Sequence, residues 1–371
     1  MQAIPLGSQR HLFDIPRDIS YLDSAAWGPL PDPVREAGEA GILSKTRPWA
    51  HSRDDDAIWT GRARAAAARL VGAAPDDIAI VGSVSHAIAT AARNLTVVPG
   101  GRILRVADEF PSMCFAWDRL AAERGLAVEI VPHPDDGDWT AALEAAITRP
   151  GAPPLAIATL TPLHWSDGAV IDLERLAPLV HAQGAALVVD ATQAAGAMPV
   201  DVARIKPDFL AFPTYKWLLG PFGLAFLYAA PHRQDGMPLE ENSGNRSATG
   251  AGRYDKGELN DPVALRMAAS GMELIEEWGA PAISARLRML TDRVADGAAA
   301  LGLSVPPRPL RVPHILGLRR PGGLPEGLIE RLRADGVFAS LRLGALRLSP
   351  HVWADEADVD RCLAALGSAL D

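Results

Sequence analysis

The chain has 371 residues, 48% of them hydrophobic and 22% charged, so it can bury a large core without disulfides or metal ions. This length corresponds to about two domains of roughly 100–200 residues each. Acidic residues outnumber basic ones by 45 to 36, giving a formal charge of −9. That balance argues against a general nucleic-acid binder, because such affinity depends on clustered Lys and Arg.

The cysteines and the N-terminus restrict the class further. Cys114 and Cys362 belong to no CxxC pair and to no Cys/His cluster with zinc spacing, so we expect no metal site and no disulfide framework. This usage is typical of the reducing cytoplasm. The first residues lack the basic and apolar regions of a signal peptide, and no apolar run approaches the ~20 residues that span a bilayer. We therefore predict a soluble, cytoplasmic protein without a membrane partner.

In chain order, helical apolar spacing at 34–46 and 58–71 is followed by an alternation of short apolar runs and Ala/Leu-rich helices. Strands are predicted at 78–81, 102–106, 127–131, 155–160, 185–190, 209–212 and 224–228. Helices are predicted between them at 84–94, 112–124, 140–147 and 173–183. Short strands that are apolar throughout and separated by helices indicate a mostly parallel sheet covered on both faces.

The pattern changes beyond residue 262. Helices are predicted at 262–278, 283–301, 326–334 and 356–366, with strands at 314–318 and 346–348. The predicted fold class is therefore α/β, with a large domain (31–275) built on a mostly parallel seven-stranded sheet between helices. A small C-terminal α+β domain (276–371) follows, and residues 1–30 are expected to form an arm that contributes to it.

Ligands of such sheets bind at the carboxyl ends of the strands, so the polar residues there are the candidate site residues. The first candidates lie in Val81-Gly-Ser-Val-Ser-His86, where a strand runs through a Gly/Ser turn into a helix. Unpaired N–H groups at the helix start, beside the hydroxyls of Ser83 and Ser85, form a pocket for an anion such as phosphate. A plain helix N-cap is the alternative interpretation.

Two more candidates follow successive strands. Asp190 ends a strongly apolar strand, where a partly desolvated carboxylate needs a cationic partner, although capping of the next helix is the alternative. Lys216 lies between Tyr215 and Trp217 after the next strand. A lysine in apolar surroundings has a lowered pKa and becomes an amine nucleophile, whereas a solvated ammonium is the commoner state of lysines.

The last candidates are Arg342 and Arg347. Arg347 lies in an alternating strand, where a buried guanidinium requires a carboxylate from the protein or from a substrate. A carboxylate and a lysine after successive strands are the two groups that pyridoxal phosphate requires. The lysine forms the Schiff base, and the acid keeps the pyridine nitrogen protonated. A phosphate pocket and an arginine for a substrate carboxylate complete this set.

At this point the sequence resembles the fold-type I pyridoxal-phosphate enzymes of the class V aminotransferase family. That family includes cysteine desulfurases, kynureninase-like lyases and isopenicillin-epimerase-like proteins. The resemblance extends over nearly the whole chain, from Tyr21-Leu-Asp-Ser-Ala-Ala26 to Val359. Its most specific stretches are Val189-Asp-Ala-Thr-Gln-Ala-Ala-Gly-Ala-Met-Pro-Val-Asp201 and Tyr215-Lys-Trp-Leu-Leu-Gly-Pro-Phe-Gly223.

The resemblance implies a role for each matching residue. Lys216 is the expected Schiff-base lysine, Asp190 the partner of the pyridine nitrogen and Gln193 the hydrogen-bond partner of the ring's phenolic oxygen. The remaining expected contacts are Val84 and Ser85 on the phosphate, His164 near the ring hydroxyl, and Arg347, with Arg342 nearby, on the substrate carboxylate. A homodimer with shared sites is also implied, in which the stretch 253–261, including Asn260, reaches the neighbouring subunit's cofactor phosphate.

The chain departs from the family in three places. Where many relatives stack a histidine on the ring, it reads Asp108-Glu-Phe-Pro-Ser112, so Phe110 or Pro111 is expected to stack. Pro213 and Thr214 stand where relatives have a phosphate-binding Ser and a Gly, so Tyr215 or another group must compensate. Residues 332–346, where desulfurases keep their nucleophilic cysteine, contain none, which disfavours persulfide chemistry.

The predicted function is that of a pyridoxal-phosphate-dependent amino-acid aminotransferase. A C–S or C–N lyase or an amino-acid epimerase of the same family is the alternative, and a non-catalytic binding protein with a degenerate site is a remote one. Two arginines near the site suit a carboxylate-bearing amino acid, whereas Trp27, Trp49 and Trp165 suit an apolar substrate pocket. The sequence leaves these substrate classes open.

Overall fold

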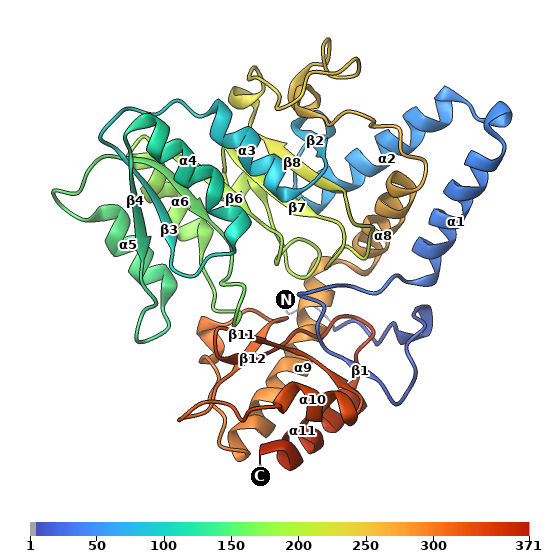
Figure 1. Ribbon diagram of the computed structural model, residues 1–371, viewed down its shortest axis with the longest axis vertical. Coiled ribbons are helices and arrows are strands. Elements are labelled where there is room, and N and C mark those ends of the chain that lie inside the picture. Colours follow the sequence, from blue (N-terminus) through green and yellow to red (C-terminus); the bar gives the residue numbers. More distant parts are fainter. Residues whose placement is uncertain (1–4, 371) are drawn as a thin grey trace.

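A seven-stranded sheet forms the centre of the computed structural model, which describes residues 5–370 (Figure 1). Its order is β2-β8-β7-β6-β5-β3-β4. The strands are β2 (Ile78–Val81), β3 (Arg102–Val106), β4 (Ala127–Val131), β5 (Leu155–Leu160), β6 (Ala186–Asp190), β7 (Phe209–Pro213) and β8 (Ala225–Ala229). Neighbouring strands pair in parallel except where β8 meets β2 and β7. The predicted mostly parallel sheet is confirmed.

Helices cover both faces of this sheet, which explains why its central strands are apolar throughout. Alternate residues of β2 pack into different cores, Ile78 and Ile80 into one, Ala79 and Val81 into the other. The smaller core is covered by α3 (Val84–Asn94) and α4 (Phe115–Arg124), and the larger one by α2 (Arg53–Val71), α5 (Trp139–Thr148), α6 (Leu173–Ala182) and α8 (Ala264–Trp278). Strands β6, β7 and β8 are therefore buried along their whole length.

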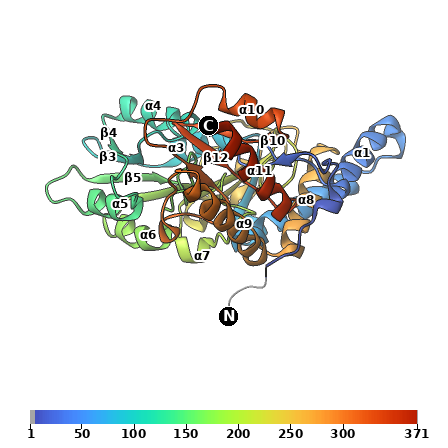
Figure 2. The same ribbon diagram turned by 90° about the horizontal axis from the view of Figure 1, so that it is seen from below.

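Two more helices belong to the part of the chain that holds the seven-stranded sheet. The four-residue α7 (Val202–Ile205) was not predicted, because one turn of helix is too short to show apolar periodicity. Helix α1 (Asp32–Thr46) packs on α8 and extends away from the body in both views (Figures 1 and 2). No helix between residues 5 and 370 is long and apolar enough to cross a bilayer.

The C-terminal part packs beneath the sheet in Figure 1. It contains α9 (Ala280–Ala300), β9 (Leu316–Leu318), α10 (Leu328–Ala334), β10 (Val337–Phe338), β11 (Ser340–Arg342), β12 (Ala345–Leu348) and α11 (Glu356–Leu370). Strands β11, β12 and β9 form an antiparallel sheet. The two-residue strands β1 (Ser20–Tyr21) and β10 pair in parallel, which joins the N-terminal arm to this part of the chain. Strands β1, β10 and β11 were not predicted, because two or three residues show no alternation.

Buried polar contacts reinforce the attachment of the arm. The Arg10 guanidinium donates to the Asp358 carboxylate at 2.8 Å, and both side chains are almost fully buried. The Trp353 indole donates to the Tyr21 carbonyl at 2.9 Å. Replacing either partner would leave a buried polar group unsatisfied, which costs about 1–3 kcal/mol. The arm is therefore held in place beside the sheet edge where the candidate site lies.

Candidate active site

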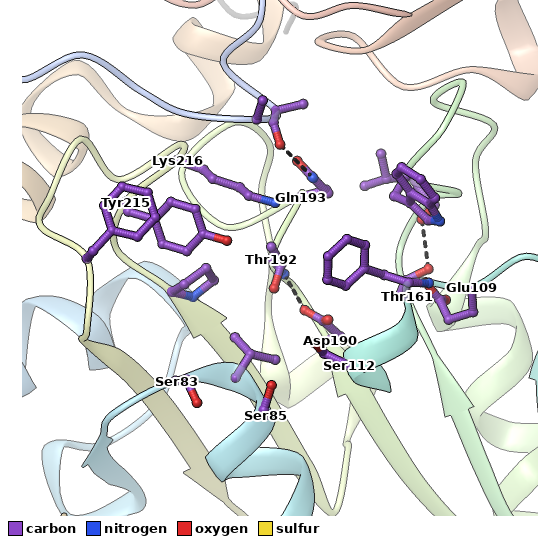
Figure 3. A pocket seen from close by; sticks show the side chains of 18 of the residues that line it. Ser83, Ser85, Glu109, Ser112, Thr161, Asp190, Thr192, Gln193, Tyr215 and Lys216 are labelled. Atoms are coloured by element: carbon purple, nitrogen blue, oxygen red, sulfur yellow. Dashed lines mark hydrogen bonds between the residues drawn. The ribbon is translucent and has the colours of Figure 1, made fainter. Parts of the chain in front are cut away.

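A cavity of about 500 Å³ opens at the carboxyl end of the sheet. Its walls come from the loops that follow β2, β3, β5, β6 and β7, from the N-terminal arm and from the hairpin β11–β12 (Figure 3). Of the residues that the sequence singled out, the lining includes Val84, Ser85, Phe110, Asp190, Gln193, Tyr215, Lys216, Arg342 and Arg347. It includes neither His164 nor Asn260.

Lys216 is held by the tight loop between β7 and β8. Thr214 closes this loop, since its hydroxyl donates to the Pro221 carbonyl at 2.5 Å and also lies 3.1 Å from the Leu224 carbonyl. The Thr214 side chain also meets Gly220, where an added Cβ would lie 2.8 Å from the Thr214 Cβ. The Thr-for-Gly departure from the family is therefore accommodated by new hydrogen bonds and by a glycine on the opposite side of the loop.

The Lys216 side chain is 8% exposed. Its Nζ lies 5.5 Å from the Tyr215 ring centre and 5.9 Å from the Phe110 ring centre. Burial lowers the pKa of Lys216 to about 8, and the Arg347 guanidinium adds to this effect. A lowered pKa increases the fraction of neutral amine near neutral pH, which is the nucleophilic form.

Asp190 presents a carboxylate with no counter-charge at contact distance. Its Oδ1 accepts from the Thr192 N–H at 2.7 Å (Figure 3). None of the Lys or Arg side chains that the structure describes forms an ion pair with it. Burial raises its pKa, while hydrogen bonding by Thr192 and the charge of Lys216 lower it. A buried carboxylate of this kind needs a cation, and a protonated pyridine nitrogen is a suitable one.

The start of helix α3 lies at one end of the cavity. Ser83 caps the helix, its hydroxyl accepting from the His86 N–H at 3.1 Å. The N–H groups of Val84 and Ser85 donate to no residue within 5–370, and both residues line the cavity beside Gly82. Unpaired N–H groups at a helix start bind phosphate well. They add donors where the nearby Pro213 provides none.

Gln193 is oriented by three neighbouring segments. Its Oε1 accepts from the Trp217 indole at 2.8 Å, and its Nε2 donates to the Ala25 carbonyl at 3.0 Å (Figure 3). Its backbone carbonyl accepts from His314 Nε2 at 2.5 Å. The amide therefore keeps one N–H for a ligand in the cavity, while the arm and the small C-terminal part fix its position.

Two buried histidines that the sequence did not single out support the loops on which Gln193 and Lys216 lie. His351 Nε2 donates to the Trp217 carbonyl at 3.0 Å, and its Nδ1 accepts from the Val352 N–H at 2.7 Å. Burial lowers the pKa of His314 to about 3 and that of His351 to about 4, so both are neutral donors. The only sequence signal is that each histidine follows a proline near a strand of the C-terminal part.

Glu109 is a third residue that sequence reasoning missed. It lines the cavity, and its Oε1 accepts from the Phe110 N–H at 2.7 Å. Its Oε2 is buried without a partner. Burial raises the pKa of Glu109 to about 7, and the nearby Asp190 charge adds to the rise. No sequence signal marked it, because an acid in an Asp-Glu pair after a strand is usually solvated.

His164 lies beside the cavity and contacts other protein groups. Its Nε2 donates to the Ala107 carbonyl at 3.1 Å, its Nδ1 lies 2.8 Å from the Ser166 hydroxyl, and its ring stacks on Trp139. The cavity wall is formed there by Thr161 and Trp165. Asn260 is exposed on the surface, away from the cavity of its own chain.

The buried Arg347 guanidinium is paired with a carboxylate of the protein itself. Its guanidinium donates to Asp23 Oδ1 at 3.2 Å and to the Trp165 carbonyl at 3.1 Å. Burial lowers its pKa to about 10, although Asp23 opposes this effect. Arg342 is only partly buried and donates to the Leu341 carbonyl at 2.9 Å.

These features define a class of protein. The fold is α/β with a mostly parallel seven-stranded sheet, and one cavity brings together a lysine, a buried carboxylate and a helix start. This combination is that of a fold-type I pyridoxal-phosphate enzyme. Residues 20–302 match the family model described as Aminotransferase class-V. The chain belongs to this family, and its cofactor is pyridoxal 5′-phosphate.

Individual relatives differ in the reactions that their names give. The chain is 28% identical to isopenicillin N epimerase from Streptomyces clavuligerus, over 94% of each protein. It is 30% identical to a probable cysteine desulfurase from Pyrococcus abyssi, over 76% of this chain and 74% of the relative. The solved cysteine desulfurase from Thermococcus onnurineus NA1 shares the fold, with a TM-score of 0.86 at 22% identity over 99% of both chains.

Proposed function

We propose that this enzyme is an amino-acid aminotransferase whose cofactor is held by Lys216, Asp190 and the start of α3. The observation that carries this assignment is the meeting of a desolvated lysine, a buried carboxylate without a counter-ion and two unpaired helix N–H groups in one cavity. When bound, pyridoxal phosphate supplies an electron sink for bonds at the α-carbon of an amino acid.

Each side chain has a separate part in this proposal. Lys216 holds the cofactor covalently through Nζ and, when released, moves the proton of the substrate's α-carbon, because a pKa of about 8 suits both acid and base roles near neutral pH. Asp190 keeps the pyridine nitrogen charged. The N–H groups of Val84 and Ser85 hold the phosphate, and Gln193 donates its remaining amide hydrogen to the ring oxygen.

The cysteines favour an aminotransferase over a cysteine desulfurase. Neither Cys114 nor Cys362 lines the cavity among residues 5–370. Cys362 is fully buried, which raises its pKa to about 12, and burial also raises the pKa of Cys114. A nucleophilic cysteine requires an accessible thiolate, which neither residue provides. Epimerisation is the second candidate, since the likeness to isopenicillin N epimerase extends over nearly the whole chain.

We also propose that the enzyme is a homodimer whose partner covers the cavity mouth. Phe222 lines the mouth and is 53% exposed, with the 60% exposed Trp27 packed edge-on against it at 5.0 Å. On the projecting α1 and the turn after it, Ile42, Leu43 and Trp49 are exposed as well. Exposed apolar groups of this size mark protein interfaces.

In such a dimer Asn260 would reach the partner's cofactor phosphate. Sedimentation showing a fully active monomer at assay concentration would contradict this proposal.

The purified holoenzyme tests the reaction type directly. It is incubated with a panel of L- and D-amino acids, with and without a keto acid as amino acceptor. We expect keto-acid formation together with conversion of the cofactor to its amine form. Inversion of the substrate without keto acid would favour the epimerase, and release of ammonia or sulfide would favour a lyase. Lys216→Ala is the matched inactive control.

A further inference from the structure

The hairpin β11–β12 presents two guanidinium groups to the cavity. In its antiparallel register Ser340 pairs with Arg347, and Arg342 pairs with Ala345. Arg342 and Arg347 are therefore diagonal neighbours on one face of the hairpin, at a separation of about 7–8 Å between such positions. Both residues line the cavity, so this face is the one turned toward the site.

The two arginines differ in how their charge is balanced. Arg347 is 2% exposed, and Asp23 from the N-terminal arm compensates its charge. Arg342 donates only to the carbonyl of its neighbour Leu341. Within residues 5–370 no carboxylate lies at ion-pair distance from it. Arg342 is thus a cation of the cavity wall without a protein counter-charge.

Both guanidinium groups act on the reactive amine. The charges of Arg347 and Arg342 each lower the pKa of the Lys216 ammonium, while Asp190 and Asp23 raise it. The cofactor phosphate already has donors at the start of α3, in the large domain, so it does not require Arg342. A substrate held next to Lys216 is therefore the ligand that remains for this cation.

The tryptophans that suggested an apolar pocket are differently placed. Trp49 is 82% exposed, and neither Trp49 nor Trp27 lines the cavity. Of the three, only Trp165 is in the wall, and it packs edge-on against Phe110 at 5.7 Å and lies 6.0 Å from the Arg347 guanidinium carbon. The two cations therefore lie beside Trp165 in a cavity whose lining also includes Phe110, Tyr215 and Phe222. A carboxylate placed near Trp165 would meet both guanidinium groups.

We propose that Arg342 binds a carboxylate on the substrate's side chain, so that the preferred substrate is a dicarboxylic amino acid. Arg347 takes the α-carboxylate with the N–H groups that Asp23 and Trp165 leave unused, and Arg342 takes the second acid through its fork of donors. This inference rests on the proposed action on amino acids and makes Arg342 the residue that determines specificity.

The test compares each acid with its own amide, because the two differ mainly in charge. Aspartate, asparagine, glutamate and glutamine are assayed with the wild-type holoenzyme and with Arg342→Gln. For whichever acid the wild type uses better, aspartate or glutamate, we expect kcat/KM to exceed that of the matching amide by at least about tenfold. Arg342→Gln should lower kcat/KM for that acid by about 10- to 100-fold, in keeping with the loss of charge-assisted hydrogen bonds. The amide should change less than about twofold. Arg333→Gln, on the exposed side of α10, is the matched control and should behave as the wild type.

A binding measurement separates this inference from the proposed function. Calorimetry should show that the wild-type holoenzyme binds glutarate, a dicarboxylate, more tightly than butyrate, a monocarboxylate. Arg342→Gln should weaken the binding of glutarate and leave that of butyrate unchanged. Equal use of acids and amides by the wild type would overturn the inference. So would an equal loss for both in Arg342→Gln, since Arg342 would then hold the α-carboxylate. If no amino acid changed the cofactor absorbance, the proposed function would fail, and glutarate binding would still decide the role of Arg342.

Discussion

The two sides of the cavity differ in whether their polar side chains and N–H groups have partners in the protein. On the sheet side, Asp190, Lys216 and the N–H groups of Val84 and Ser85 have no charged partner at contact distance. On the side of the arm and the C-terminal part, Arg347 is paired with Asp23 and His351 with the Trp217 carbonyl, and the partly buried Arg342 is the exception. Unpaired buried groups lower stability, so they persist where a ligand completes them. Paired groups instead hold the walls in place.

Replacing Lys216 tests the sheet side most severely. Lys216→Ala removes the amine that we propose holds the cofactor and moves the α-proton, so we expect activity to fall to background. Because Lys216 has no ion-pair partner between residues 5 and 370, the fold should remain intact. Borohydride reduction of the wild type followed by peptide mapping should place the pyridoxyl mass on Lys216. A label on another lysine would show that the assignment is wrong.

Asp190→Asn is expected to have the next largest effect. The amide keeps the shape of the carboxylate but removes the charge that we propose holds the pyridine nitrogen protonated. We therefore expect kcat to fall by about 10²–10³-fold, as for other preorganised electrostatic groups. The apo-protein should unfold at the same or a higher temperature than the wild type, because a desolvated carboxylate without a counter-ion has been removed. Near-normal turnover would contradict the role, and strong destabilisation would place Asp190 among the structural groups.

The histidines of the other side should affect stability through pH. The folded-state pKa of His351 is lowered to about 4, and that of His314 to about 3, below the value of about 6.5 expected in the unfolded chain. The unfolded state therefore binds protons first as the pH falls below about 6.5, and the contribution of each histidine is complete only above that pH. At about pH 5 each histidine should therefore lower the free energy of unfolding by about 2 kcal/mol relative to its value well above pH 6.5.

This dependence is measured as a difference between variants. His351→Gln keeps a side-chain N–H but cannot titrate, so its unfolding midpoint should fall less steeply than that of the wild type on acidification from about pH 7 to about pH 5. The exposed His11→Gln is the matched control and should follow the wild type. Parallel curves for His351→Gln and the wild type would show that His351 is not held as a neutral donor.

The smallest effect is expected for the cysteines. Both lie outside the cavity, and the pKa of each thiol is raised by burial, so the double variant Cys114→Ala, Cys362→Ala should keep aminotransferase activity within about twofold of the wild type. The buried Cys362→Ala change should cost some thermal stability. Loss of activity with the cofactor retained would instead require a thiol in the reaction and would reopen a desulfurase-like mechanism.

The strands of the large sheet were predictable because each is short, apolar throughout and bounded by turns or helices. The predicted bounds of β2, β3, β4 and β5 agree with the structure to the residue. The strands of the C-terminal part were only half predicted, since β10 and β11 have two and three residues. Strand β10 also depends on pairing with the distant β1. Local periodicity carries no information about such partners.

By itself the sequence determined which segments are the strands of the mostly parallel sheet and that Asp190 and Lys216 follow successive strands. Those features depend on local patterns along the chain. Only the tertiary structure decided that Asp23 pairs with Arg347, 324 residues away, and that Arg342 has no carboxylate partner within residues 5–370. It also brought His314 onto the Gln193 carbonyl and buried Glu109 beside Asp190. Pairing and burial arise from the packing of segments that are far apart in the sequence, so no local pattern of residues specifies them.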